Sequence, residues 1–412
     1  MQLSEAPRLR LSWTTAGMMW TREEIAMHIR RSMLAGEPPS LDSIYKGLSL
    51  AGRVHPKYQP VFEKLSEADR AAVALYFLPH GSKKEALEVT RPRVVKWYCP
   101  FADQRVFPSG HRYCINVYTG CEHHCQYCYV AGYSAAEPNC KNRFRHDLCK
   151  DLEALDAFDV PPAPVHLSNS TDPLQPLEQQ HRHTLFVLEK LAEHRNRFTT
   201  VTLLTKNPAV LMDERYVRVL HRLNQLPPDH PRRYWFNEEG HPPFRLECSL
   251  AFCNDEHRQL LDPEAPSVES RMEALRFLRS QGLPIFLRID PLFPRDPLGS
   301  GKTMADFRLP DVQSMRDLEG LVRFGKELAS PHIIYSAAKI TRPQRGSLPP
   351  VMERLKQVYQ HLSAGQPLVF HGGSWRLPES VAAALVLMPF LELCGRHSIP
   401  AQPCKMNLIT TP

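Results

Sequence analysis

From about residue 113 onward, the chain alternates between short, continuously apolar runs and longer segments in which apolar residues recur every three to four positions. The apolar runs predict β-strands, because a strand of a parallel sheet is covered on both faces and needs apolar side chains throughout. These strands are expected at 113–117, 165–167, 200–205, 245–252, 284–290 and 332–337.

The amphipathic segments between these runs predict helices at 177–194, 210–223, 267–281 and 312–328. The segment 267–281 has the clearest signals, since Ser267 can cap its start and Gly282 can end it. Met272, Leu275 and Leu278 would form its inner stripe. A repeated strand-then-helix pattern predicts an α/β fold, a partial or complete (β/α) barrel with active groups at the C-terminal ends of the strands. No G-x-G-x-x-G follows any of these strands, which disfavours a dinucleotide-binding fold.

The first 92 residues show helical rather than strand patterns, and Thr21 is a candidate N-cap for the first of these helices. We therefore expect a helical N-terminal extension over 1–92, a (β/α) core over 93–345, and a C-terminal segment over 346–412 that completes or flanks the core. An insertion at 225–244 is rich in proline, histidine and arginine and contains Tyr234, Trp235 and Phe236. A solvated loop is favoured there over a base-stacking surface.

The amino-acid composition restricts the class of protein but does not indicate a function. A hydrophobic fraction of 42% fits an ordinary packed core, and a net charge of +7 permits a polyanionic partner such as nucleic acid without requiring one. No secretory signal is recognisable, and the most apolar run, 381–394, is too short to span a bilayer. A cytoplasmic location is therefore expected. There, an odd count of 11 cysteines indicates free thiols and metal ligation rather than a disulfide framework.

Three of these cysteines lie within eight residues, as Cys121-x3-Cys125-x2-Cys128. Clustered thiolates are soft ligands suited to an iron–sulfur cluster or to zinc. A structural zinc site takes four tetrahedral ligands, and no second C-x2-C follows, but a zinc site could be completed by His123, His124, Cys114 or Cys140. The spacing alone leaves both kinds of site open.

The three-cysteine pattern, with Tyr127 directly before its last cysteine, resembles the signature of the radical SAM superfamily. Within it, four features are similar in order to proteins related to spore photoproduct lyase: segments 116–129, 170–178 and 204–208, and then Ala265-Pro-Ser with Arg271 ahead of Gly282. The resemblance covers roughly 95–345. It implies a (β/α) barrel whose cysteine loop follows the first strand and holds three irons of a 4Fe-4S cluster. The fourth iron is then left for S-adenosylmethionine.

The resemblance also implies roles for individual residues. Cys121, Cys125 and Cys128 would be the cluster ligands, and Tyr127 would lie near the adenine. The remaining residues would meet the methionine or ribose part of S-adenosylmethionine: Ser168, Asn169, Thr171, Asp172, Lys206, Glu247 and Arg288. Each of these has a structural alternative, and residues 171–173 also read as an Asp-capped turn that opens the next helix.

Spore photoproduct lyase uses a further cysteine as hydrogen-atom donor, for which Cys140 and Cys149 are the candidates here, with ordinary buried thiols as the alternative. Cys394 and Cys404 could hold a second metal, although their wide separation disfavours it.

The expected function is reductive cleavage of S-adenosylmethionine to a 5′-deoxyadenosyl radical, which abstracts hydrogen from an unidentified substrate. Nucleic acid is the candidate substrate, and a flavodoxin or ferredoxin the candidate electron donor. The alternatives are a zinc-bearing nucleic-acid-binding or scaffold protein, and a non-catalytic member that binds the cluster.

Overall fold

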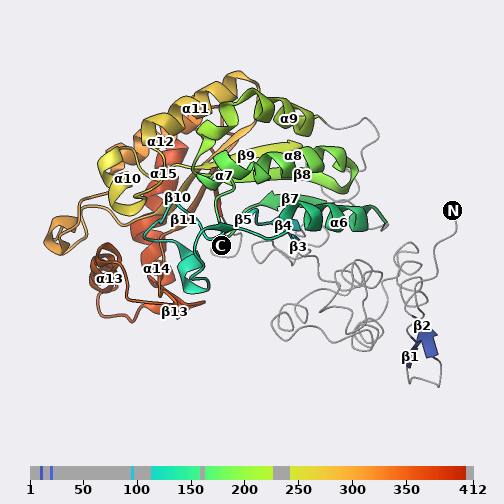
Figure 1. Cartoon of the computed structure of the whole chain (residues 1–412). Coiled ribbons are helices and arrows are strands. Elements are labelled where there is room, and N and C mark those ends of the chain that lie inside the picture. Colours follow the sequence, from blue (N-terminus) through green and yellow to red (C-terminus); the bar gives the residue numbers. More distant parts are fainter. Residues whose placement is uncertain are drawn as a thin grey trace.

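A curved sheet of eight strands organises the computed structural model, which describes residues 10–12, 19–21, 94–96, 113–157, 163–225 and 242–404 (Figure 1). The strand order is β15-β11-β10-β9-β8-β7-β4-β3. In chain order the strands are β3 (Val95–Lys96), β4 (Tyr113–Ile115), β7 (Ala163–Leu167), β8 (Phe198–Thr205), β9 (Phe244–Ser249), β10 (Ile285–Leu292), β11 (Ile333–Ala337) and β15 (Ala401–Pro403).

From β4 to β15 every neighbouring pair of this sheet is parallel, and only β3 pairs antiparallel, with β4. The edge strands β3 and β15 do not pair with each other, so the sheet is an open barrel. The expectation of an α/β fold with a partial (β/α) barrel is confirmed. All six strands predicted between residues 113 and 337 are present.

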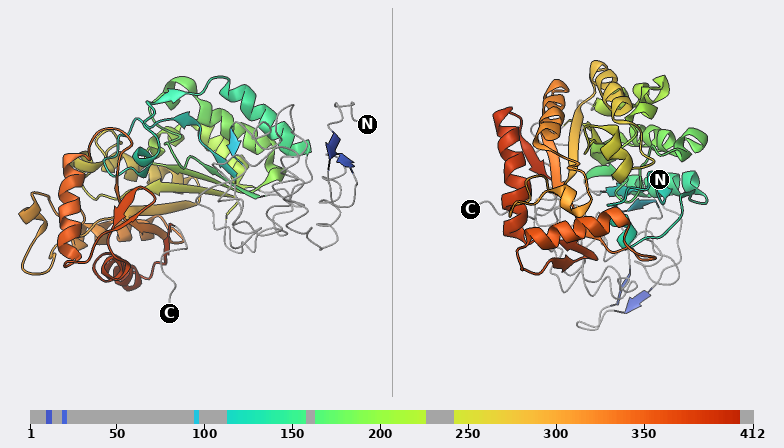
Figure 2. Two further views of the ribbon diagram at one scale, coloured as in Figure 1. Left: turned by 90° about the horizontal axis from the view of Figure 1, so that it is seen from below. Right: turned by 90° about the vertical axis from the view of Figure 1, so that its left-hand side faces the viewer.

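Helices cover the convex face of the sheet. Figures 1 and 2 show α8 (His183–Glu193), α9 (Glu214–Asn224), α11 (Val268–Ser280) and α12 (Met315–Glu327) following one another along it, in the order of the strands that they connect. α6 (Phe144–Ala157) continues this layer towards β4. Each helix contributes an apolar stripe to one core, including Leu188, Leu220, Leu275 and Leu321.

Within α11 the capping prediction is confirmed, since Ser267 Oγ accepts a hydrogen bond from the backbone N–H of Ser270 at 3.1 Å. The stripe differs slightly from the expected one, because Leu275 and Leu278 are fully buried whereas Met272 is only partly buried. The residue beside it, Arg271, is 1% exposed and points into the protein.

Two predicted helices are interrupted. The segment 177–194 forms α7 (Leu177–His181) and α8, which are separated by Arg182 in the left-handed region at φ 48°. The segment 210–223 begins instead as a 3₁₀ turn (Pro208–Met212), and α9 starts only after Asp213, whose side chain caps it. Apolar periodicity cannot reveal such breaks, because the apolar residues keep nearly the same spacing on both sides.

Several helices of the structure were not predicted, among them α6 and α10 (Asp255–Leu261). The seven residues of α10 contain only two apolar ones, and it is set by a local cap, in which Asn254 Oδ1 accepts from the backbone N–H of His257 at 2.8 Å.

The C-terminal residues add a small antiparallel sheet, β12 (Ile340–Thr341), β14 (Ser374–Arg376) and β13 (Val369–His371). They also form α13 (Pro350–Leu362), α14 (Glu379–Ala382) and α15 (Met388–Arg396), after which β15 extends the main sheet beside β11. Another hairpin pairs β5 (Tyr118–Thr119) with β6 (Asn139–Cys140).

Of the predicted N-terminal extension, the structure describes only β1 (Arg10–Ser12) and β2 (Met19–Thr21), which pair antiparallel. This pair of strands differs from the helical pattern that we expect over 1–92, and Thr21 lies in β2. The helices expected in 22–93 and the aromatic residues of the 225–244 insertion lie outside the described residues. Within the described residues, no helix is both long and apolar enough to cross a membrane.

Candidate active site

Polar side chains gather at the C-terminal edge of the parallel sheet, where the residues after successive strands meet. The cysteine loop follows β4 and β5, residues 168–172 follow β7, and Lys206 follows β8. Ser249 ends β9, Asp290 lies near the end of β10, and Cys404 follows β15. This is the edge at which barrel enzymes carry their active groups.

The cysteine loop begins at a position that only glycine fits. Gly120 has φ +68°, and a Cβ there would lie 2.6 Å from the carbonyl oxygen of Ala136. The Gly120 carbonyl accepts a hydrogen bond from the Thr171 hydroxyl. The backbone N–H of Glu122 donates to Gln175 Oε1 at 2.7 Å. The loop is therefore fixed against the residues that follow β7.

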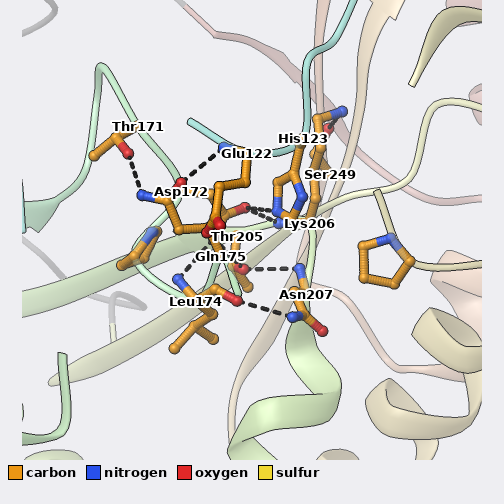
Figure 3. Close-up of polar contacts among 12 residues, drawn as sticks. Glu122, His123, Thr171, Asp172, Leu174, Gln175, Thr205, Lys206, Asn207 and Ser249 are labelled. Atoms are coloured by element: carbon orange, nitrogen blue, oxygen red, sulfur yellow. Dashed lines mark hydrogen bonds and ion pairs between the residues drawn. The ribbon is translucent and has the colours of Figure 1, made fainter. Parts of the chain in front are cut away.

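Asp172 is the centre of this contact, and Figure 3 shows it between the cysteine loop and the end of β8. Its Oδ1 accepts from the Leu174 N–H and the Thr205 hydroxyl, both at 2.8 Å, and its Oδ2 accepts from the Lys206 N–H at 2.6 Å. Nε2 of buried His123 lies 3.2 Å from the same Oδ2, close enough for an ion pair but without hydrogen-bond geometry. Burial opposes ionisation, yet His123 and the amide donors outweigh it and lower the pKa of Asp172.

Lys206 reaches from the end of β8 towards the cysteine loop. Its Nζ lies 2.8 Å from Asp262 Oδ2, 2.7 Å from the Tyr127 hydroxyl and 3.4 Å from Ser249 Oγ. Burial opposes its charge, but the carboxylate of Asp262 outweighs burial and raises the pKa of Lys206. The Lys206 ammonium group, predicted to meet the methionine carboxylate, thus already has a carboxylate partner in Asp262. The same ammonium group also contacts the hydroxyl of Tyr127.

Tyr127 also packs against two phenylalanines, with its ring centroid 6.4 Å from that of Phe252 and 5.6 Å from that of Phe293. The ring therefore belongs to an aromatic cluster, and Lys206 Nζ lies 5.2 Å from its centroid. Aromatic rings of this kind can pack against the flat face of a base, which is the contact expected of Tyr127.

The turn after β7 contains a buried hydroxyl without a partner. Ser168 is 1% exposed, has φ +63°, and its Oγ has no hydrogen-bond partner among the described residues. Next to it, the N–H groups of Asn169 and Ser170 donate to Asn116 Oδ1 at 2.9 and 3.1 Å. Backbone strain and an unsatisfied polar atom at one residue are features that concentrate at ligand-binding sites.

The strands β9 and β10 contribute a buried ion-pair network. Glu247 accepts from Arg288 Nη1 at 2.6 Å and from Arg245 Nη2 at 2.9 Å. Arg288 Nη2 lies 2.5 Å from Asp290 Oδ2 and 2.7 Å from Cys404 Sγ. Burial opposes ionisation of Glu247, but the two guanidinium groups outweigh it and lower its pKa well below the usual range. The network is charged and extends from within β9 and β10 to Asp290 and Cys404.

The three loop thiols have the soft-ligand chemistry that an iron–sulfur cluster requires. Burial, together with the charge of Asp172, raises the pKa of Cys121 to about 12, and burial also raises the pKa of Cys125 and Cys128. Binding to a cationic centre would reverse this by holding the thiolates. Among the described residues, the three sulfur atoms are not a group within 4.8 Å of one another. Zinc–sulfur bonds of about 2.3 Å would bring tetrahedral ligands to about 3.8 Å.

The cysteines outside the trio are distributed over the fold. Cys140 lies in β6, Cys149 in α6 on the outer helical layer, and Cys394 is buried in α15. Cys114, considered above as a zinc ligand, is buried in β4, where its sulfur accepts from Asn169 Nδ2 at 2.7 Å. Cys114 and Cys404 therefore each contact a predicted site residue, Asn169 and Arg288 respectively.

Sequence reasoning missed Asp262, Asn116 and Gln175. Asp262 follows the unpredicted α10 and is fully buried, so nothing in its sequence neighbourhood marks it. Asn116 and Gln175 lie inside the two segments that carry the family resemblance, and that position was the available signal for them.

No family model and no curated protein matches the chain. Among solved structures it is similar to a variant of spore photoproduct lyase at 13% identity, covering 81% of this chain and 84% of that one, with a TM-score of 0.47. It is also similar to spore photoproduct lyase complexed with dinucleoside spore photoproduct, at 14% identity over 75% of this chain and 78% of that one, with a TM-score of 0.48. A third similar structure is Streptococcus suis SuiB bound to S-adenosylmethionine, at 10% identity over 82% of this chain and 59% of that one, with a TM-score of 0.37. The chain itself has an open, mainly parallel α/β barrel with a three-cysteine loop beyond its first parallel strand.

Proposed function

We propose that this protein is a radical SAM enzyme. The observation that carries the proposal is the cysteine loop with three thiols and no fourth, fixed through Asp172 at the edge of the sheet where barrel active sites lie. When bound, a 4Fe-4S cluster would supply the electron that cleaves S-adenosylmethionine to methionine and a 5′-deoxyadenosyl radical. The chain's own residues would hold, orient and shield the reactants.

The positions around the thiols suit the two ends of S-adenosylmethionine. Tyr127 would cover the adenine with the face of its ring, and the unpartnered hydroxyl of Ser168 would donate to a ligand oxygen. Lys206 keeps two short contacts and one of 3.4 Å to Ser249, and a methionine carboxylate could replace the last. Thr171, Asp172 and Asn169 would act by fixing the loop.

The network of Glu247 and Arg288 offers charged groups for the ribose or the carboxylate. The role of hydrogen-atom donor stays a proposal for Cys140 and Cys149. We keep the division into a core over 93–345 and a completing segment over 346–412, for which the pairing of β15 with β11 is the support. A helical role for 1–92 stays a prediction from sequence.

We propose nucleic acid as the substrate class. Two tyrosines directly beyond the trio, Tyr129 and Tyr133, are 38% and 49% exposed, with ring centroids 6.1 Å apart. Both hydroxyls bond to the turn after β7, to the carbonyl of Asn169 and to Ser170 Oγ, which holds the rings at the rim of the site. Exposed aromatic rings on a protein with a net positive charge suit the stacking of unpaired bases. A dinucleoside is the ligand of one similar structure, spore photoproduct lyase.

The reaction is proposed to take place in the cytoplasm with an electron from a flavodoxin or ferredoxin.

The test is anaerobic incubation of the cluster-containing protein with dithionite and S-adenosylmethionine, followed by chromatographic measurement of 5′-deoxyadenosine. Wild-type protein should form it, and Cys125→Ala should not. Cys253→Ala is the matched control, because this half-buried thiol lies outside the loop and should leave the yield unchanged. Absence of 5′-deoxyadenosine from the wild type, or equal yields from the wild type and Cys125→Ala, would refute the proposal.

Two alternatives have distinct outcomes. A zinc-bearing scaffold would be colourless when isolated without oxygen and would contain stoichiometric zinc and no iron. A non-catalytic member would contain the cluster and bind S-adenosylmethionine, yet form no 5′-deoxyadenosine with any candidate nucleic acid present.

A further inference from the structure

A second group of metal-ligand side chains lies outside the cysteine loop. Cys140, His181 and His183 each offer one ligand atom, and these three atoms all lie within 4.8 Å of one another. In the described part of the chain this is the one group of three or more His, Cys, Asp or Glu side chains that meets that distance. Cys140 ends β6, and the two histidines flank the break between α7 and α8.

The break in the helix is what brings the histidines together. In a continuous helix, residues two apart point in different directions. Here Arg182, between them, has left-handed φ and ψ of 48° and 40°, and the two imidazole centroids lie 5.7 Å apart. A side chain other than glycine in this conformation is uncommon, so the sequence maintains a strained turn at the point where the two rings meet.

The His183 ring is held by its neighbours before any ligand arrives. It stacks on Phe144 with a centroid distance of 5.0 Å and on Tyr118 with a distance of 5.8 Å. Its backbone N–H donates to the Tyr118 hydroxyl at 3.4 Å. A ligand whose ring is already fixed loses little conformational freedom on binding.

We propose that Cys140, His181 and His183 bind one zinc-class divalent metal ion, separate from the cysteine loop. A thiolate and two imidazoles are ligands that zinc prefers, and a solvent molecule would take the fourth position of the tetrahedron. The ion would join the β5–β6 hairpin to the α7–α8 junction. Because the cysteine loop leaves that hairpin directly after β5, the ion would stiffen the base of the loop.

The positive charge of Arg145 opposes metal binding, and this gives the proposed site a specific test. Its Nε lies 3.4 Å from His183 Nδ1, and its Nη2 donates to the His181 carbonyl at 2.8 Å. An ion on His183 must share this space with a guanidinium charge or displace it. Removing the charge should therefore tighten binding, by about tenfold for a divalent ion and a unit charge about 5 Å apart in water.

The test uses the full chain with Cys121, Cys125 and Cys128 replaced by alanine, so that the loop thiols cannot contribute. Cobalt(II) is titrated anaerobically, and zinc affinity is then measured by competition with a chromophoric chelator. One ion per chain with a thiolate-to-cobalt charge-transfer band is expected. Replacing Cys140 by serine should abolish the band, and His183→Ala should weaken affinity at least tenfold. His146→Ala, an exposed histidine of α6, should change nothing.

Arg145→Gln keeps the inference testable even where the ligand variants fold poorly, since a gain in affinity cannot arise from misfolding. About tenfold tighter zinc binding in this variant supports the site. Unchanged or weaker binding in Arg145→Gln, or no cobalt–thiolate band in the background chain, would overturn it. Because the loop thiols are absent, neither result depends on the proposed enzymatic function.

Discussion

The buried pair of Lys206 and Asp262 offers the most quantitative prediction about this site. Asp262 is fully buried, its Oδ2 lies 2.8 Å from Lys206 Nζ, and Arg271 Nη1 lies 3.9 Å from the same oxygen. Asp262→Asn keeps the shape but removes the negative charge, which leaves two buried cations facing each other. Breaking such a pair on one side costs about 3–5 kcal/mol, because the remaining charge stays desolvated.

The free energy of unfolding should accordingly fall by about 3 kcal/mol or more in Asp262→Asn, measured by urea denaturation without oxygen at equal iron content. The matched control is Glu327→Gln, which breaks an ion pair of 2.5 Å to Arg276 between side chains that are about half exposed. There the loss should stay below about 1 kcal/mol. Adding Lys206→Met to Asp262→Asn should recover part of the loss. Equal losses in the two single variants, or no recovery in the double variant, would refute the reasoning.

This difference between wild type and Asp262→Asn should also depend on pH with a definite sign. The pKa of Asp262 is lowered in the fold, since Lys206 and Arg271 outweigh the opposing effect of burial. Its contribution is therefore present above the ordinary value of 3.8 and is lost as pH falls through the lowered one. The pKa of Lys206 is raised from 10.5, so its share is present below that value and lost only as pH rises through the raised one. Between pH 6 and 9 the difference should stay constant, and urea curves over this interval measure it.

Three further predictions concern the loop, the cosubstrate and the substrate. Gly120→Ala should lower the iron content after reconstitution, because the added Cβ would lie 2.6 Å from the carbonyl oxygen of Ala136. Ser168→Ala should weaken S-adenosylmethionine binding, measured by equilibrium dialysis, by about 1 kcal/mol with little change in stability, since its hydroxyl has no partner among the described residues. Tyr133→Ala should weaken binding of a short single-stranded DNA by about 1–3 kcal/mol in a fluorescence titration, whereas Phe370→Ala, 53% exposed on β13, should not.

Each of these predictions has a contrary result. Normal iron content in Gly120→Ala would mean that the loop does not need its tight start. Unchanged cosubstrate affinity in Ser168→Ala would remove that hydroxyl from the site. Equal effects of Tyr133→Ala and Phe370→Ala on DNA binding would argue against stacking at the rim.

Sequence patterns could predict the sheet, because buried parallel strands demand continuous apolar runs that are visible locally. The same holds for the cysteine trio, whose members are close in the chain, and for Lys206 and Asp172, which follow strands and therefore had to meet at one edge. The helix predictions that were wrong concern segments in which the backbone interrupts the helix. Nothing in the apolar spacing of 177–194 marks the left-handed turn at Arg182.

Partners that are distant in sequence were also beyond reach. Asp262 meets Lys206 across 56 positions, and Cys140 meets the histidines of α7 and α8 only through the β5–β6 hairpin. Both arrangements follow from tertiary packing, and Asp262, Cys140 and the two histidines lie outside the segments that carry the family resemblance. The sequence thus indicated the chemistry of the site more fully than the contacts that support it.

The proposed function depends most directly on a cluster held by three thiols, with one iron left for S-adenosylmethionine. Protein isolated without oxygen should contain about four iron and four sulfide ions per chain, and its visible absorption and electron paramagnetic resonance spectra should change when S-adenosylmethionine is added. Cys125→Ala should lose both the iron and the change. Stoichiometric zinc with no iron, or a cluster whose spectra do not respond to S-adenosylmethionine, would contradict the account.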